Sequence, residues 1–137
     1  VLVAGAADGW MRLWSVRTMT LLAEVQVCTA EGEGLQDVCC EPSATLLLCG
    51  DSNGRLHVYD ASDLSTYWLA WQAQGSVVNE HSGAPVLESA SVLQPLYTWR
   101  AHTRAITRLA YLTGVEGVLS SSTDCTVRLW TLSGEQV

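Results

Sequence analysis

The chain has 137 residues, and 7 basic residues, all of them arginine, against 14 aspartates and glutamates give it a formal charge of −7. This acidic balance argues against nucleic-acid binding, which needs clustered positive charge, and the absence of lysine excludes Schiff-base chemistry. The 48% hydrophobic content is too high for a disordered chain, yet no apolar run approaches the roughly 18 residues of a membrane helix. We therefore expect a folded chain that binds no nucleic acid and no membrane.

The cysteine count also restricts the class of protein. There are five cysteines, an odd number with no C-x-x-C pair: Cys28, Cys39, Cys40, Cys49 and Cys125. Disulfide frameworks and structural zinc sites need pairable or regularly spaced ligands. We therefore expect reduced thiols that act as small buried hydrophobes in an intracellular protein, with no metal site and no cofactor.

A short pattern occurs three times, at Gly5–Trp14, Gly50–Tyr59 and Ser121–Trp130. Each copy has Asp or Asn at its fourth position, followed by alternating residues that end in an aromatic. This period of two is typical of a β-strand, and Asp8-Gly9 and Asn53-Gly54 favour the tight turn of a hairpin. Because an apolar strand precedes each turn, we predict three copies of a β-hairpin.

The third copy carries the most specific pattern. It has Asp124 in the turn, an alternation up to Trp130, and Ala101-His102 upstream where Gly-His is usual. These residues resemble the WD repeat of β-propeller proteins, and the 28 residues from His102 to Trp130 suit that family. The resemblance covers nearly the whole chain except about residues 61–94.

The resemblance implies an all-β fold, a partial WD-repeat β-propeller of about two and a half four-stranded antiparallel blades from a larger ring. On the family's pattern the first blade lacks its innermost strand and the last lacks its outermost strand. The strands that this pattern predicts are Val1–Ala4, Trp10–Ser15, Leu21–Val27, Leu35–Cys40, Thr45–Cys49, Arg55–Asp60, Leu96–Arg100, Ala105–Tyr111, Val118–Ser122 and Thr126–Leu132.

The spacing of the repeats predicts where the blades begin and end. Trp14 and Tyr59 are 45 residues apart, about one propeller repeat, whereas Tyr59 and Trp130 are 71 residues apart. We therefore divide the chain into residues 1–27 (strands b to d of a partial blade), 28–60 (strands a to c of the next), 61–94 (an insertion in its c–d connection), 95–100 (its outer strand d) and 101–137 (strands a to c of a third blade and the start of d).

Four polar or aromatic residues of the third copy match the structural hydrogen-bond set of the family, namely His102, Ser120, Asp124 and Trp130. The resemblance implies that they stabilise the blade. Ser, His and Asp are also the residues of a hydrolase triad, but no oxyanion-hole motif accompanies them here. We favour the structural role and predict no catalytic and no cofactor-binding residue.

The second copy lacks this set, because Cys49 stands at the position of Ser120 and the loop before the blade carries no histidine. We therefore expect the second blade to depend on apolar packing and hairpin bonding, with faster amide exchange in Thr45–Asp60 than in Val118–Leu132. Asp51–Gly54 resembles the start of a calcium loop, but its glycine stands fourth instead of sixth, so we predict a hairpin turn.

Two groups of residues are candidate partner contacts. Arg100, Arg104 and Arg108 surround His102 and form either rim charges packed on apolar surface or a patch for an acidic partner. Tyr67, Trp68 and Trp71 lie in the insertion and either cover the ring or anchor an interface. Leu64, Trp68 and Trp71 have the spacing of one helix face, but the segment fits the alternation of a strand equally well. We interpret Glu80-His81 as solvated and not as metal ligands.

These observations favour a non-enzymatic protein–protein interaction scaffold, with other proteins as its partners. Trp99–His102, Ile106–Tyr111 and Asp124–Leu132 with Gly134 are also similar to the large ciliary WD-repeat proteins, some of which carry EF-hands. That similarity implies a structural component of an axonemal complex, located in the cytoplasm or in the cilium and cytoskeleton. The alternatives are a propeller attached to or part of an enzyme, and a reader of acidic or phosphorylated peptides.

Overall fold

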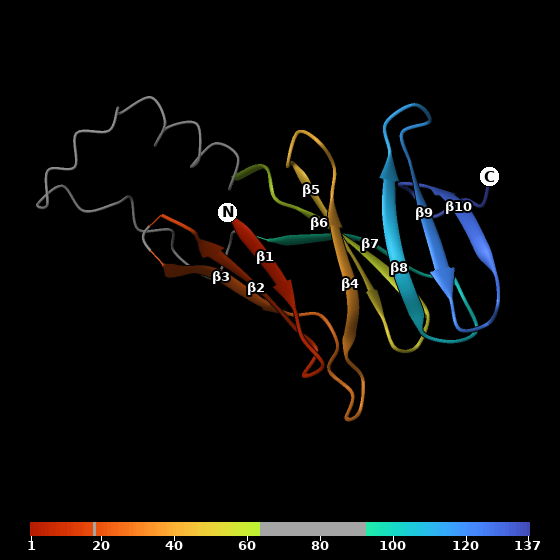
Figure 1. The fold of residues 1–137 in the computed structure, drawn as a ribbon, viewed down its shortest axis with the longest axis horizontal. Coiled ribbons are helices and arrows are strands. Elements are labelled where there is room, and N and C mark those ends of the chain that lie inside the picture. The colour runs from red at the N-terminus through yellow and green to blue at the C-terminus, as the bar shows by residue number, and fades with distance from the viewer. Residues whose placement is uncertain (18, 64–92) are drawn as a thin grey trace, which may run out of the picture.

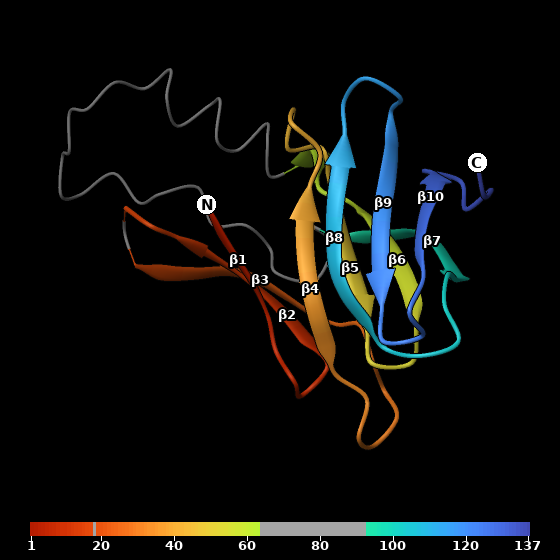
Figure 2. The ribbon, with the colours of Figure 1, turned by 45° about the vertical axis from the view of Figure 1, so that its right-hand side comes forward.

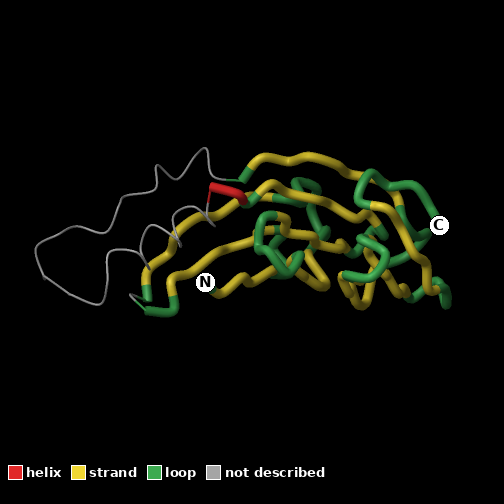
Figure 3. The backbone as a smooth tube through the Cα atoms, turned by 90° about the horizontal axis from the view of Figure 1, so that it is seen from above, coloured by secondary structure: helices red, strands yellow, loops and turns green. Residues whose placement is uncertain are grey.

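The computed structural model describes residues 1–17, 19–63 and 93–137, and ten strands form its secondary structure together with a short helical turn at residues 62–63 (Figure 3). The strands are β1 (Leu2–Gly5), β2 (Trp10–Ser15), β3 (Thr20–Gln26), β4 (Leu35–Cys40), β5 (Leu46–Asp51), β6 (Arg55–Asp60), β7 (Gln94–Arg100), β8 (Ile106–Leu112), β9 (Gly117–Ser122) and β10 (Val127–Thr131). Within the described ranges, no helix is long and apolar enough to cross a bilayer.

The strands form three antiparallel sheets, which follow one another along the chain (Figure 1). The first sheet has the order β1-β2-β3, the second β4-β5-β6-β7 and the third β8-β9-β10. β6 and β7 are hydrogen-bonded neighbours although residues 61–93 separate them in the sequence. This all-β arrangement is the expected one, and it is consistent with a partial WD-repeat propeller.

The predicted strands agree closely with the observed ones. The ranges predicted for β2, β4 and β6 coincide with the structure, and the other seven differ by one or two residues at one or both ends. The agreement is good because period-two alternation and turn glycines fix both the middle and the ends of a hairpin strand.

Two apolar cores hold the sheets together, one on each face of the second sheet. Met11 and Leu13 of β2 pack with Leu47 of β5 in the first core, whereas Leu48 of β5 packs with Ile106 in the second. Successive residues of β5 point to opposite faces, so consecutive leucines supply both cores. Burial of each leucine contributes about 1.5–3 kcal/mol relative to an exposed side chain.

The outer faces of the first and third sheets are open to solvent in the described structure. Leu2 on the first sheet is 55% exposed and Val127 on the third is 63% exposed. The two middle strands of the second sheet, β5 and β6, are by contrast buried on both faces. Each sheet is therefore covered only where another sheet packs on it, as expected for slices of a ring.

The second and third sheets also meet through their first strands, β4 and β8, which run side by side in both ribbon views (Figures 1 and 2). The Asp37 carboxylate on β4 accepts a hydrogen bond from the backbone N–H of Leu109 on β8 at 2.7 Å. This bond fixes the register of the two sheets at the edge where no ladder joins them.

A second joint forms where the chain enters the third sheet. The carbonyl oxygen of Gly54, in the β5–β6 turn, accepts hydrogen bonds from the backbone N–H groups of Ala101 and His102, both at 2.9 Å. Gly54 has a φ of +80°, and a Cβ there would lie 2.4 Å from the His102 carbonyl oxygen. Only glycine fits this turn, and the joint places His102 beside the third sheet.

The same joint occurs one sheet earlier. The carbonyl oxygen of Gly9, in the β1–β2 turn, accepts hydrogen bonds from the backbone N–H groups of Val27 and Cys28 at 2.9 and 3.2 Å. Gly9 has a φ of +81°. Cys28 therefore has the same relation to the second sheet that His102 has to the third.

Candidate functional site

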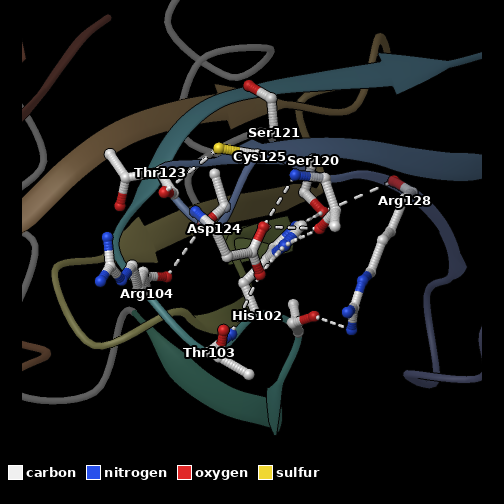
Figure 4. A network of polar contacts seen from close by, with 12 residues as sticks. His102, Thr103, Arg104, Ser120, Ser121, Thr123, Asp124, Cys125 and Arg128 are labelled. Atoms are coloured by element: carbon white, nitrogen blue, oxygen red, sulfur yellow. Dashed lines mark hydrogen bonds and ion pairs between the residues drawn. The ribbon is translucent and has the colours of Figure 1, made fainter.

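The site built by the third repeat is a chain of hydrogen bonds centred on His102, which is buried where the chain leaves β7 (Figure 4). Its Nδ1 lies 3.0 Å from a carboxylate oxygen of Asp124, in the β9–β10 turn. Its Nε2 lies 2.8 Å from the hydroxyl of Ser120, on β9. The imidazole thus joins the entering loop to the turn of the β9–β10 hairpin and to its first strand.

Trp130 on β10 completes this network. Its indole N–H donates to the Ser120 hydroxyl at 2.9 Å. The register of the hairpin explains the contact, because Ser120 is paired with Arg128 and Trp130 lies two residues further on the same face. The structure therefore brings His102, Ser120, Asp124 and Trp130 together in one bonded set.

The Asp124 carboxylate is held ionised by its neighbours. Hydrogen bonds from the Thr126 hydroxyl and backbone N–H, from the backbone N–H of Thr103 and from His102 outweigh desolvation and hold the pKa of Asp124 well below its usual value. A carboxylate on Nδ1 favours the tautomer with the proton on that nitrogen. Nε2 then accepts the Ser120 O–H, and the hydroxyl oxygen accepts the Trp130 N–H.

The bonding order Ser120–His102–Asp124 is that of a hydrolase triad, but the serine is not accessible to a substrate as it would be in a hydrolase. Ser120 has no exposed surface, and its hydroxyl oxygen is already the acceptor for the Trp130 indole. A nucleophile must reach a substrate carbonyl, and this oxygen faces only protein. In this geometry the set supports a structural role, which removes the cost of several buried polar groups.

The second sheet differs from the sequence expectation. Instead of apolar packing alone, it holds a buried pair in which His57 Nε2 lies 3.0 Å from a carboxylate oxygen of Asp51. His57 Nδ1 lies 3.1 Å from the Thr98 hydroxyl of β7. The other Asp51 oxygen accepts the backbone N–H groups of Asn53 and Arg55 at 2.9 and 2.8 Å. The expectation of a purely apolar second blade is therefore wrong.

The pair was missed because it occupies other positions in the repeat. In the repeat, His57 stands at the position of Arg128 and Asp51 at the position of Ser122. Neither residue therefore occupies a position of the His102 hydrogen-bond set. Strand alternation could have found them, because Cys49 pairs with His57 and Asp51 shares its face. Burial would raise the pKa of Asp51, but the hydrogen bonds from His57 and from the backbone of Arg55 and Asn53 hold it below its usual value.

The cysteines are all free thiols, and only some match the expectation of buried hydrophobes. Cys28 and Cys49 are buried, whereas Cys40 and Cys125 are exposed, so the expectation is wrong for the latter two. Burial raises the pKa of Cys28 to about 11 and that of Cys39 to about 12, so these thiols stay protonated at neutral pH.

The candidate partner contacts fall in two classes. Arg100, Arg104 and Arg108 are exposed, and the Arg100 Nε–H donates to the His102 carbonyl oxygen at 3.3 Å. Arg104 and Arg108 form no ion pair with any described residue. The remaining candidates lie outside the described residues, namely Tyr67, Trp68 and Trp71, as do Glu80 and His81.

Comparison with known proteins supports the repeat family. Residues 93–131, which run from β7 through β10 and include the His102 network, match the family described as "WD domain, G-beta repeat". The chain is also similar to the target of rapamycin complex subunit wat1 of Schizosaccharomyces pombe, with 25% identity over 94% of this chain and 46% of that protein. The chain thus spans about half the length of this relative. The WD-repeat resemblance is confirmed over the matched residues.

Proposed function

We propose that this chain forms consecutive blades of a WD-repeat β-propeller and acts as a non-enzymatic scaffold for protein–protein interaction. The observation that carries the proposal is the His102 network, which ties the entering loop, a hairpin turn and two strands into one rigid edge. Rigid edges that hold exposed loops suit recognition of other proteins. The similar wat1 protein is a subunit of a complex, which supports the same role.

On this proposal the blades are bounded as the repeat spacing suggests. Residues 1–27 are strands b to d of one blade, residues 28–60 with 95–100 form the next, and 101–137 begin a third. Residues 61–94 are an insertion between the third and fourth strands of the middle blade. The chain acts inside the cell, and its partners are proteins.

Arg104 and Arg108 mark the proposed contact surface. Both are exposed and form no ion pair with any residue in the described part of the chain. Two such guanidinium groups fit a carboxylate-rich or phosphorylated protein segment, and this is the specific form of the scaffold role that we propose.

Affinity purification of the tagged full-length protein tests both the scaffold role and the arginine contact surface. We expect it to elute from size exclusion with a stoichiometric partner, and the double variant Arg104→Glu/Arg108→Glu to recover at least several-fold less of it. Arg17→Glu, at an exposed arginine in the β2–β3 turn, is the control and should recover the partner fully. Equal recovery by all variants would refute the arginine surface, and elution as a monomer without partners would refute the scaffold.

A narrower form of the proposal places the protein in a ciliary axoneme complex. It is supported by the sequence pattern of the third repeat, from Trp99 to Leu132 with Gly134. Fractionation of ciliated cells tests it. The full-length protein should remain with detergent-extracted axonemes, and complete release into the soluble fraction would refute this placement.

A further inference from the structure

A second polar cluster lies in the core between the first and second sheets. It comprises Cys28, which follows β3, Asp51 at the end of β5 and His57 within β6. All three side chains are buried, and one ligand atom from each, the thiol sulfur, a carboxylate oxygen and an imidazole nitrogen, lies within 4.8 Å of the other two. The cluster therefore joins the loop that follows the first sheet to two strands of the second sheet.

Each of the three residues is positioned by hydrogen bonds on the side that faces away from the cluster. The Cys28 backbone N–H donates to the Gly9 carbonyl oxygen, which fixes the position of its Cα. Two backbone N–H groups bind the Asp51 oxygen that faces away from the imidazole. His57 is oriented by the Thr98 hydroxyl on its Nδ1, so its Nε2 faces the cluster. This is how protein metal sites orient their ligands before the ion arrives.

We propose that Cys28, Asp51 and His57 bind one Zn²⁺ ion between the first and second sheets. A thiolate, an imidazole and a carboxylate favour zinc over magnesium or calcium, which prefer oxygen ligands alone. Ligands at zinc distances of about 2.0–2.3 Å are roughly 3.3–3.8 Å apart in a tetrahedral site. The separations in the cluster, none above 4.8 Å, must therefore contract by at most about 1 Å. The 3.0 Å between His57 Nε2 and the Asp51 oxygen must widen by about 0.3 Å or more, and small side-chain rotations can supply both changes.

The charge and proton balance suits a buried site. The Cys28 thiol loses its proton to solvent as the sulfur–zinc bond forms, and Asp51 binds as the carboxylate that it already is. The thiolate and the carboxylate together neutralise the ion, so no net charge is buried in the apolar core. The His57 proton moves to Nδ1, from which it donates to Thr98, and the Nε2 lone pair binds the metal.

This site explains why the cysteine spacing gave no indication of zinc. The expectation of no metal site considered ligands that are close in sequence, whereas these three are brought together by the joint at Gly9 and by the β5–β6 hairpin. The ion would link the first two sheets at the position where the His102 hydrogen bonds link the second and third.

Cobalt titration of the full-length protein, purified with chelator, tests the proposal. We expect one Co²⁺ per chain with a thiolate-to-cobalt charge-transfer band, displaced by an equivalent of Zn²⁺. Cys28→Ser should abolish the band, and His57→Gln should weaken binding at least tenfold. Thr98→Val, which keeps all three ligands, should weaken it about 10- to 100-fold. Cys125→Ser, an exposed cysteine outside the cluster, should titrate like the parent.

Amide exchange supplies a second readout that does not require the variants to fold. Zn²⁺ should slow exchange in β3 and β6 of the parent protein, and chelator should restore the original rates. A parent protein that shows no thiolate band, or a folded Cys28→Ser variant that binds as tightly as the parent, would overturn the proposal. Either result would leave His57 and Asp51 as a hydrogen-bonded pair only.

Discussion

Replacement of Ser120 by alanine is the most direct test of the His102 network. The hydroxyl is fully buried, donates to His102 Nε2 and accepts the indole N–H of Trp130. Its removal leaves His102 Nε2 and the Trp130 indole nitrogen without this partner in the buried core. An unsatisfied buried polar group costs about 1–3 kcal/mol, so we expect Ser120→Ala to destabilise the third sheet by about 2–4 kcal/mol.

Hydrogen exchange of the full-length protein measures this loss locally. The amides of β9 should exchange roughly 30- to 1,000-fold faster in Ser120→Ala. Ser121→Ala is the matched control, because the Ser121 side chain lies on the other face of β9 and its hydroxyl bonds the exposed Thr107 of β8. This substitution should change stability by less than about 0.5 kcal/mol. Trp130→Phe removes the indole donor, so the double variant should lose about 1 kcal/mol less than the sum of the single ones. Equal exchange in Ser120→Ala and Ser121→Ala would refute the reasoning.

Three further predictions concern the joints and the two polar clusters. Gly54→Ala should destabilise the protein by more than about 2 kcal/mol, because φ is +80° and the new methyl group meets a backbone oxygen, whereas Gly114→Ala, in open space, should be neutral in the same melt. The folded pKa of Asp124 is lowered, so its stabilisation is complete above the unfolded value near 4 and is lost as pH falls. Asp124→Asn should therefore flatten the fall in Tm between about pH 5 and pH 3. An unchanged slope would contradict a stabilising role of the ionised Asp124 carboxylate. Because β5 is buried on both faces and the second sheet holds its own polar pair, amide exchange in Leu46–Asp51 should be no faster than in Gly117–Ser122, contrary to the order expected from sequence.

Much of this fold could be predicted from sequence because it is built from local hairpins. Alternation in Arg55–Asp60 and the turn at Asn53-Gly54 specify a strand and its start without any knowledge of the rest of the chain. The pairing of β6 with β7 is different, since residues 61–93 intervene. Only the resemblance to a four-stranded repeat predicted that contact, because no local pattern encodes a partner so distant in the sequence.

The two polar clusters show the same division. His102 and Asp124 could be predicted because they stand at the positions that the repeat pattern specifies. The repeat pattern does not reveal Asp51 and His57, because they use a different pair of positions on the same sheet face. Strand alternation combined with the β5–β6 register is the signal that brings them together. Their proximity to Cys28 depends in addition on the packing of one sheet on another, which no single repeat encodes.

The repeated joint accounts for both clusters at once. In each case the carbonyl of a turn glycine with φ near +80° accepts two successive backbone N–H groups from the chain that enters the next sheet. Backbone bonds of this kind do not depend on the side chain that follows, so the position can carry His102 at one junction and Cys28 at the next. The buried space beside it must still be filled by groups that satisfy one another. A repeat that lacks the expected histidine and serine therefore need not lose its buried hydrogen-bond network. Other polar residues on the facing strands can form a different network in the same space.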